Sequence, residues 1–407
     1  MKTILFAQEF GGGYGHLTHL TGIASQLRRH NLVFALPRQS VARQLIEARV
    51  APGLDIREAP PWQNPANLQA RRQPDVTLAD AFHRIGYHEL ARLAPVAQAW
   101  SALIDDLRPD LIIGDFVPTL RLICSPSIPM LVVGGWYMTP PPGRELPAIR
   151  FWENYLPPAS RRRESEALAA ANAVRRQNGR PALAFFVDLF QGERSFATGF
   201  AGFDPYARYR SDKLLQPYNI GDITPGPPVA DRRGPAVFCY LGQEMPGLNA
   251  VLTALNGLAA PSQVFVRGVD PHEVASNCAP QVSVHPKPAD LAVVLPQAQL
   301  FLHYGAAGAT YSGLLAGVPQ FMCSDSLEHQ ANAWCIQQAG CGLGATVARD
   351  ADPDRLRGII ETLLADRTRQ AHALAYAQQL ARDRDPDPRR AIVAAAQAFL
   401  AEAGPGR

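Results

Sequence analysis

The segment His303-Tyr304-Gly305-Ala306-Ala307-Gly308-Ala309-Thr310 joins the apolar run Leu300-Phe301-Leu302 to a stretch with helical spacing. Its small residues let a ligand approach the backbone closely. The N–H groups at the start of the following helix, together with the positive end of the helix dipole, suit an anion such as a phosphate. A tight strand-to-helix turn without a ligand would need the same small residues. This segment alone therefore leaves both interpretations open.

Strand-like and helix-like patterns alternate along the rest of the chain, which is typical of an α/β fold with parallel sheets. Short, wholly apolar runs such as Leu111-Ile112-Ile113 are expected of strands covered on both faces. Gly and Pro are dense over residues 219–235, as in a linker, and the alternation then restarts. We therefore expect two Rossmann-like α/β domains facing across a cleft, residues 1–222 and 223–385. A C-terminal helix within 386–407 can pack back on the N-terminal domain.

Composition narrows the class of protein. The 407 residues carry 39 Lys plus Arg against 36 Asp plus Glu, a formal net charge of +3, and 47% are hydrophobic. This balance argues against a disordered chain and against nucleic-acid binding. The six Cys show no CxxC spacing, which favours thiols in a reducing compartment. Without a signal-peptide pattern or an apolar run of ~20 residues, we expect a cytoplasmic protein, and peripheral membrane contact stays open.

A second polar set follows Gly317-Val318-Pro319 and a short apolar strand. It reads Glu328-His329-Gln330-Ala331-Asn332-Ala333. Glu328 and Asn332 are four residues apart, so they share one face of a helix that begins there. A carboxylate can accept hydrogen bonds from two sugar hydroxyls, and a neighbouring amide or imidazole can add another. A charge that only complements the helix dipole is the alternative for Glu328 alone.

Taken in order, these residues resemble the donor motif of the GT-B glycosyltransferases. The likeness is greatest to the bacterial branch related to UDP-glucuronosyltransferases and macrolide glycosyltransferases, and residues 300–345 carry its specific part. The resemblance implies that the donor diphosphate contacts His303, Gly305, Ala307, Gly308, Ala309 and Thr310. It implies that nucleotide ribose or donor-sugar hydroxyls contact Glu328, His329, Gln330 and Asn332. It implies that loops near the nucleotide contain Gly15, Gly242 and His285.

The N-terminal part of the chain offers a base. Direct transfer with inversion needs a group that removes the proton of the acceptor hydroxyl, and a neutral His is well suited. His16 follows the Gly-rich loop at residues 11–15, begins a helix expected over residues 16–29, and matches the catalytic His of the family's Gly-His motif. His19, near the same helix face, is the rival base. Asp115, at the end of an apolar strand, is the expected orienting carboxylate, in agreement with the resemblance.

Other nucleotide and metal chemistries fit the sequence less well. The Gly-rich loop lacks Gly-x-Gly-x-x-Gly spacing, and there is no Gly-Lys-Ser/Thr P-loop. Asp-x-Asp strings lie at 352/354, 383/385 and 385/387, in Pro-rich or Arg-rich stretches typical of solvated loops. We therefore expect no metal and no cofactor, with the nucleotide sugar as a co-substrate.

The acceptor is expected to contact N-domain loops, roughly residues 62–90 and 136–200. Trp136 and Tyr137 follow a strand end and are the pocket candidates, which predicts an apolar or aromatic hydroxylated acceptor. The predicted function is an inverting, metal-independent glycosyltransferase of the hexosyltransferase type. It would move a sugar from UDP or TDP to a hydroxyl of a natural product or lipid, as a monomer or homodimer. A nucleotide-sugar epimerase of the same fold and a non-catalytic nucleotide-sugar-binding protein are the alternatives.

Overall fold

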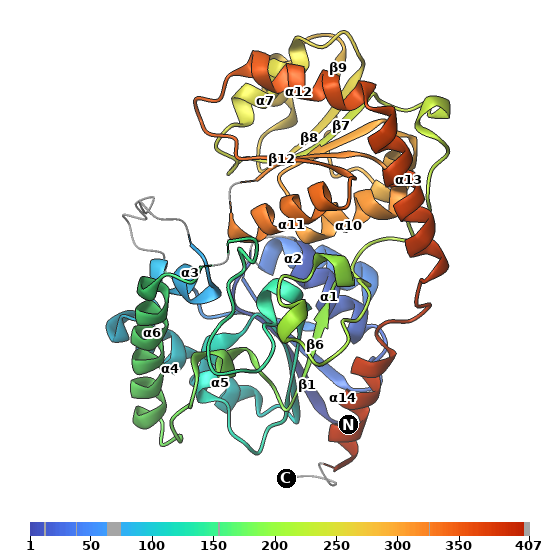
Figure 1. Cartoon of the computed structure of the whole chain (residues 1–407). Coiled ribbons are helices and arrows are strands. Elements are labelled where there is room, and N and C mark those ends of the chain that lie inside the picture. The colour runs from blue at the N-terminus through green and yellow to red at the C-terminus, as the bar shows by residue number, and fades with distance from the viewer. Residues whose placement is uncertain (12–13, 38, 63–74, 154, 325, 403–407) are drawn as a thin grey trace. The chain divides into compact units, whose positions relative to one another are not determined.

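A computed structural model describes residues 1–11, 14–37, 39–62, 75–153, 155–324 and 326–402 (Figure 1). The chain divides into two compact units. Unit 1 contains Met1–Asn219 and Asp387–Arg407, and unit 2 contains Ile220–Pro386. The boundaries predicted from the sequence lie after residues 222 and 385. Within the described residues, no helix has the length and apolar character needed to cross a membrane.

The sheet of unit 1 is parallel in every described pairing, with strand order β3-β2-β1-β4-β5-β6. Its strands are β1 (Thr3–Gln8), β2 (Asn31–Leu36), β3 (Asp55–Glu58), β4 (Leu111–Asp115), β5 (Met130–Gly135) and β6 (Arg194–Thr198). The α-helices of this unit are α1 (Tyr14–Ala24), α2 (Gln39–Arg49), α3 (Leu78–Arg84), α4 (Leu90–Leu107), α5 (Pro118–Ile123), α6 (Pro158–Gln177) and α14 (Arg390–Glu402).

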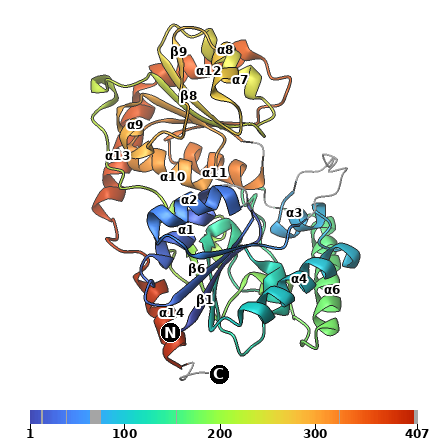
Figure 2. The same cartoon turned by 180° about the vertical axis from the view of Figure 1, so that it is seen from behind.

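Helices cover both faces of this sheet, which explains why its strands are apolar at nearly every position. Alternate residues such as Ile4 and Phe6 of β1 pack in one core cluster with residues of α1, α2 and α14. The helices α4 and α6 lie on the other side, as the rear view shows (Figure 2). The last helix, α14, contributes Ile392, Val393 and Leu400 to the unit 1 core, so the chain returns to this unit after unit 2.

Unit 2 repeats the arrangement. Its parallel sheet has the order β12-β11-β10-β7-β8-β9. Its strands are β7 (Val237–Gly242), β8 (Ser262–Arg267), β9 (Val282–Val284), β10 (Leu300–His303), β11 (Gln320–Cys323) and β12 (Gly342–Ala345). Its α-helices are α7 (Leu248–Asn256), α8 (Pro271–Ser276), α9 (Leu291–Val294), α10 (Ala307–Ala316), α11 (Leu327–Gln338), α12 (Pro353–Ala365) and α13 (Arg367–Arg382).

In each unit, the first strand lies between the second and the fourth, so the strand order reverses beside it. In open parallel sheets of this kind, ligands bind at the carboxyl ends of the strands near that reversal. The pairs that meet there are β1 with β4 in unit 1 and β7 with β10 in unit 2. The predicted α/β class with parallel sheets is confirmed.

Candidate active site

The carboxyl end of β4 lies beside the carboxyl end of β1. Gln8, the last residue of β1, is paired with Asp115, the last residue of β4. The chain leaves β1 and soon enters α1, which carries His16 and His19 in its first two turns. The strand register therefore brings one carboxylate and two imidazoles to the same edge of the sheet.

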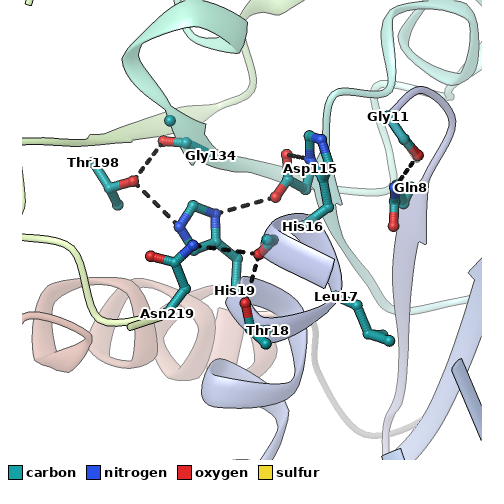
Figure 3. A network of polar contacts seen from close by, with 12 residues as sticks. Gln8, Gly11, His16, Leu17, Thr18, His19, Asp115, Gly134, Thr198 and Asn219 are labelled. Carbon is teal, nitrogen blue, oxygen red and sulfur yellow. Dashed lines mark hydrogen bonds and ion pairs between the residues drawn. The ribbon is translucent and has the colours of Figure 1, made fainter. Parts of the chain in front are cut away.

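The three side chains are in direct contact, as Figure 3 shows. His16 Nδ1 lies 2.9 Å from Asp115 Oδ1, and His19 Nδ1 lies 3.2 Å from Asp115 Oδ2. Each carboxylate oxygen thus accepts from a different imidazole. Asp115 is fully buried, whereas the His16 side chain is 11% exposed and that of His19 is 6% exposed. The paired His16 and Asp115 of the sequence analysis are therefore neighbours in space.

The charge of Asp115 depends on these two partners. Burial alone would raise the pKa of Asp115, but the charge and hydrogen bonds of His16, together with those of His19, outweigh it. They hold the pKa of the Asp115 carboxyl well below its usual range. Asp115 is therefore an anion throughout the pH range in which an imidazole can accept a proton.

Two glycines let the backbone approach His16 and Asp115, here called the dyad, closely. Gly11 has φ +92°, and a Cβ there would collide with the His16 ring at Nε2. A Cβ at Gly134 of β5 would lie 2.9 Å from Asp115 Oδ1. Neither position tolerates a side chain without moving a member of the dyad, so both glycines fix its geometry.

Aromatic rings gather beside His16, and the sequence analysis missed the most important of them. Phe116 directly follows Asp115 and has φ +56°, an uncommon backbone conformation for a residue with a side chain. Its ring is nearly parallel to that of His16, at 6.4 Å between centroids, and it also neighbours Phe10, Phe82 and Tyr137. In the sequence, the only feature that points to Phe116 is its position directly after an Asp at the end of a strand.

The acceptor candidates are placed differently from one another. Tyr137 is half-buried and edge-on to Phe116 at 6.4 Å. Trp136 is 1% exposed and packs edge-on to Tyr206. Trp62 is half-buried and lies 5.9 Å from Phe10, while residues 63–74 of the expected acceptor loop lie outside the described residues. Among these candidates, Tyr137 and Trp62 belong to the aromatic surface near His16, and Trp136 belongs to the core.

A buried carboxyl group, Glu9, holds the loop that carries Asp115 and Phe116. Glu9 Oε2 accepts from the backbone N–H of Thr119 at 2.9 Å. Burial raises the pKa of Glu9 from 4.5 to about 8, against smaller opposing effects of hydrogen bonds from Thr119 and Leu120. Glu9 is therefore mostly protonated at neutral pH, and folding takes up a proton at this site.

Replacing Glu9 should make the protein more resistant to alkaline unfolding. A folded-state pKa above the unfolded value gives stability that is complete below pH 4.5 and is lost as the pH rises through about 8. At about 1.4 kcal/mol per pKa unit, this loss is roughly 4–5 kcal/mol. We expect Glu9→Gln to abolish it, so that the variant unfolds at higher denaturant concentration than the wild type at pH 9, with a smaller difference at pH 5. Exposed Glu47 gives the control Glu47→Gln, and equal pH dependence of Glu9→Gln and wild type would contradict the assignment.

In unit 2, the loop after β10 is held from inside the protein. His303 is fully buried, and its Nε2–H donates to Gln320 Oε1 at 2.8 Å, while its Nδ1 accepts from the N–H of Gly305 at 3.1 Å. Burial lowers the pKa of His303 to about 3, so the ring is neutral. Both ring nitrogens are engaged within the protein. The diphosphate contact that the resemblance implies for His303 stays a prediction.

The loop ends at the start of α10, whose N-cap, Ala306, provides no side-chain hydrogen bond. The first N–H groups of a helix have no carbonyl partner within the helix, so they can bind an anion. Ala307 and Gly308 are half-buried, and a Cβ at Gly308 would meet no atom within 4 Å. The hydroxyl of Thr310, in contrast, donates to the Ala306 carbonyl at 3.0 Å and is buried.

The first turn of α11 presents the other predicted donor residues. Glu328, His329 and Gln330 are half-buried there, and His329 is edge-on to Tyr304 at 5.2 Å. Asn332 is fully buried, and its amide donates to the carbonyl of Gly305 at 2.9 Å. Asn332 therefore holds the backbone of the loop after β10, and Glu328, His329 and Gln330 lie nearer the surface.

Three residues near this loop were not predicted. Arg267 ends β8 and pairs with Glu244, which follows Gly242 at the end of β7. Tyr304 is largely buried, and burial raises its pKa above the usual value. A cation at a strand end beside a candidate anion site is the signal that could have identified Arg267.

The remaining predicted positions are His285 in unit 2 and Gly15 in unit 1. His285 hydrogen-bonds to Gln263 at 3.0 Å, near the start of β8 and four residues before its carboxyl end. Gly15, in unit 1, is exposed, and its carbonyl accepts from the Thr18 hydroxyl. Among the described residues, there is no group of three or more His, Cys, Asp or Glu side chains arranged to hold a metal ion.

Comparisons with known proteins agree with this architecture. Residues 272–398 match the family model described as erythromycin biosynthesis protein CIII-like, C-terminal domain. A search of curated proteins finds no match. The structure is similar over nearly its whole length to solved glycosyltransferases. The chain has the GT-B glycosyltransferase fold. The resemblance inferred from residues 300–345 is thereby confirmed.

Three solved structures illustrate the likeness. The calicheamicin glycosyltransferase CalG4 has a TM-score of 0.63 and 18% identity, covering 99% of each chain. The spinosyn rhamnosyltransferase SpnG has a TM-score of 0.64 and 15% identity, covering 98% of this chain and 100% of its own. The glycosyltransferase VinC has a TM-score of 0.61 and 16% identity, covering 99% and 100%. At these identities, the comparison establishes the GT-B fold of the chain.

Proposed function

We propose that the protein is an inverting, metal-independent glycosyltransferase that moves a sugar from a nucleoside diphosphate to a hydroxyl of a small apolar or aromatic acceptor. The single observation that carries the proposal is the His16–Asp115 contact of 2.9 Å at the carboxyl ends of β1 and β4. A buried carboxylate that accepts from Nδ1 fixes the tautomer and stabilises the imidazolium that forms when Nε2 takes a proton. That is the requirement for a general base acting on a hydroxyl.

In this proposal, the acceptor lies against the aromatic side chains near His16. Phe116, Tyr137 and Phe10 offer apolar surface, and His16 removes the proton as the acceptor oxygen attacks the anomeric carbon. The bond from that carbon to the diphosphate oxygen breaks as the new glycosidic bond forms, which inverts the configuration. The titles of SpnG structures with spinosyn aglycone and of other natural-product enzymes support an acceptor of this class.

The donor binds in unit 2. The N–H groups at the start of α10 would hold the diphosphate, whose developing charge in the transition state they stabilise without a metal. Glu328, His329 and Gln330 would hold sugar or ribose hydroxyls, and His303 and Asn332 would keep the loop at Gly305 in place. Structures of SpnG with thymidine diphosphate and of VinC with DTDP support TDP as the first nucleotide to test, with UDP as the second.

The proposal is tested by product analysis. Purified protein is incubated with TDP-sugars and UDP-sugars and a panel of hydroxylated aromatic and macrocyclic acceptors, with chelator present, and the products are identified by mass spectrometry. A glycoside and a free nucleoside diphosphate are expected. Isomerised donor without glycoside would instead identify an epimerase, and nucleotide binding without any turnover would identify a binding protein.

Charge at Gly308 should control donor binding. Because a Cβ there meets no atom within 4 Å, a short side chain fits without displacing its surroundings. Asp would place a negative charge in the first turn of α10, where it repels a diphosphate by about 1–2 kcal/mol. We expect Gly308→Asp to weaken TDP binding roughly 5–30-fold in calorimetry, with Gly308→Asn, of the same size, as the neutral control. Equal affinities of the two variants would contradict a diphosphate at this helix end.

A further inference from the structure

His19 has a buried partner on each ring nitrogen. Its Nδ1 lies 3.2 Å from Asp115 Oδ2, and its Nε2 lies 3.4 Å from the hydroxyl of Thr198 at the end of β6. That hydroxyl in turn contacts the carbonyl of Gly134 at 3.1 Å (Figure 3). His19 is 5% exposed, and the ring of Tyr218 lies 5.1 Å from it. His19 therefore links α1 to β4, β5 and β6 below the surface.

Asp115 fixes which nitrogen of a neutral His19 ring carries the hydrogen, and Thr198 faces the other nitrogen. The Thr198 hydroxyl has a single hydrogen, which it donates either to the Gly134 carbonyl or to His19 Nε2. An ionised carboxylate can only accept, so His19 Nδ1–H donates to Asp115. Both nitrogens of His19 thus face groups of the protein, which favours His16 as the base.

We propose that His19 is a positioning residue. It holds the second carboxylate oxygen of Asp115, and so fixes the orientation of the carboxylate group that contacts His16. Its catalytic consequence depends on the proposed transfer reaction, whereas its effect on the dyad does not. A carboxylate held through one oxygen can rotate about its last side-chain bond. Donors on both oxygens, with no room for a side chain at Gly134 beside Oδ1, oppose that rotation.

Loss of the His19 donor has a definite electrostatic direction. Among the described residues, the contacts near the two imidazoles include three titratable or charged groups. They are Asp115 of β4, Tyr218, whose ring lies beside His19, and Arg389, which donates to the Gly22 carbonyl. With one donor fewer, Asp115 carries more negative charge toward His16 and binds its imidazolium more tightly. The acid limb of the activity profile should therefore move to higher pH.

The test replaces His19 by Gln or by Asn, whose side chains both end in an amide. Asn places its NH₂ group near the position of imidazole Nδ1 and can still donate to Asp115, whereas Gln places its NH₂ group nearer Nε2 and reaches toward Thr198. We expect His19→Gln to lower kcat on the order of 10-fold with the KM of donor and acceptor unchanged, and to move the acid limb of kcat/KM upward by about half a pH unit or more. His19→Asn should recover most of this loss. His30→Ala, which removes an imidazole of unit 1 just before the amino end of β2, is the control.

A second measurement does not need turnover. The NMR titration of the His16 ring, assigned from its loss in His16→Gln, should shift upward in His19→Gln and stay near wild type in His19→Asn. If Gln and Asn variants match wild type in both kcat and the His16 titration, or if only Asn is impaired, the positioning role is rejected. If no protein makes a glycoside but the His16 titration shifts as expected, the proposed function fails and the positioning role stands.

Discussion

Replacing His16 by Ala should reduce kcat for sugar transfer roughly 10²–10⁴-fold, the usual contribution of a general base. The reason is local: His16 is the imidazole whose Nδ1 is held by Asp115 at 2.9 Å and whose side chain keeps some exposure at the sheet edge. The diphosphate is proposed to bind residues of unit 2. The affinity for TDP, measured by calorimetry, should therefore equal that of the wild type.

The control for His16→Ala is a histidine of unit 1 that the mechanism does not use. His30 directly precedes the amino end of β2, whereas His16 lies at the carboxyl ends of β1 and β4. His30→Ala should transfer sugar at the wild-type rate. A His16→Ala enzyme with kcat within threefold of wild type would remove His16 from the role of base.

Replacing Asp115 by Asn should cost nearly as much, roughly 10²–10⁴-fold in kcat. The two carboxylate oxygens of Asp115 accept from His16 and His19. An amide has one accepting oxygen and one NH₂ group, so one imidazole N–H must face another donor or turn away. The His16 tautomer and ring orientation needed for proton removal are then no longer favoured.

Because Asp115 acts through His16, the two losses should not add. The double variant His16→Ala/Asp115→Asn is expected to have the activity of His16→Ala alone. The measurement is a double-mutant cycle on kcat, with unfolding monitored in parallel since Asp115 is buried. Fully multiplicative losses would show that Asp115 acts independently of the imidazole.

The sequence predicts those features that depend on local pattern. Wholly apolar strands indicate parallel sheets, and parallel strands bring their carboxyl ends to one edge. From this alone, Asp115 at the end of its strand and His16 after the first strand are expected to be neighbours, as they are. The expected helix over residues 16–29 is shorter in the structure: α1 ends at Ala24, and tighter hydrogen bonds such as that from Gln26 to Ile23 follow.

Features that depend on contacts between residues far apart in the sequence could not be predicted from local pattern. His303 is occupied by Gln320, seventeen residues away, so its ring serves the loop. Thr198 contacts His19 although 179 positions separate them. The burial of Glu9 and the positive φ of Phe116 arise from packing around the loop after β4. No periodicity marks these residues, because each is defined by residues remote in sequence.

The central claim is that His16, oriented by Asp115, deprotonates an acceptor hydroxyl that displaces a nucleoside diphosphate in one step. The most direct test is the anomeric configuration of the product formed from a TDP-sugar of known configuration, read from NMR coupling constants, for the wild type and His16→Ala with chelator present. The account predicts a single glycoside of inverted configuration from the wild type and almost none from His16→Ala. A glycoside of retained configuration, or equal product from both proteins, would contradict it.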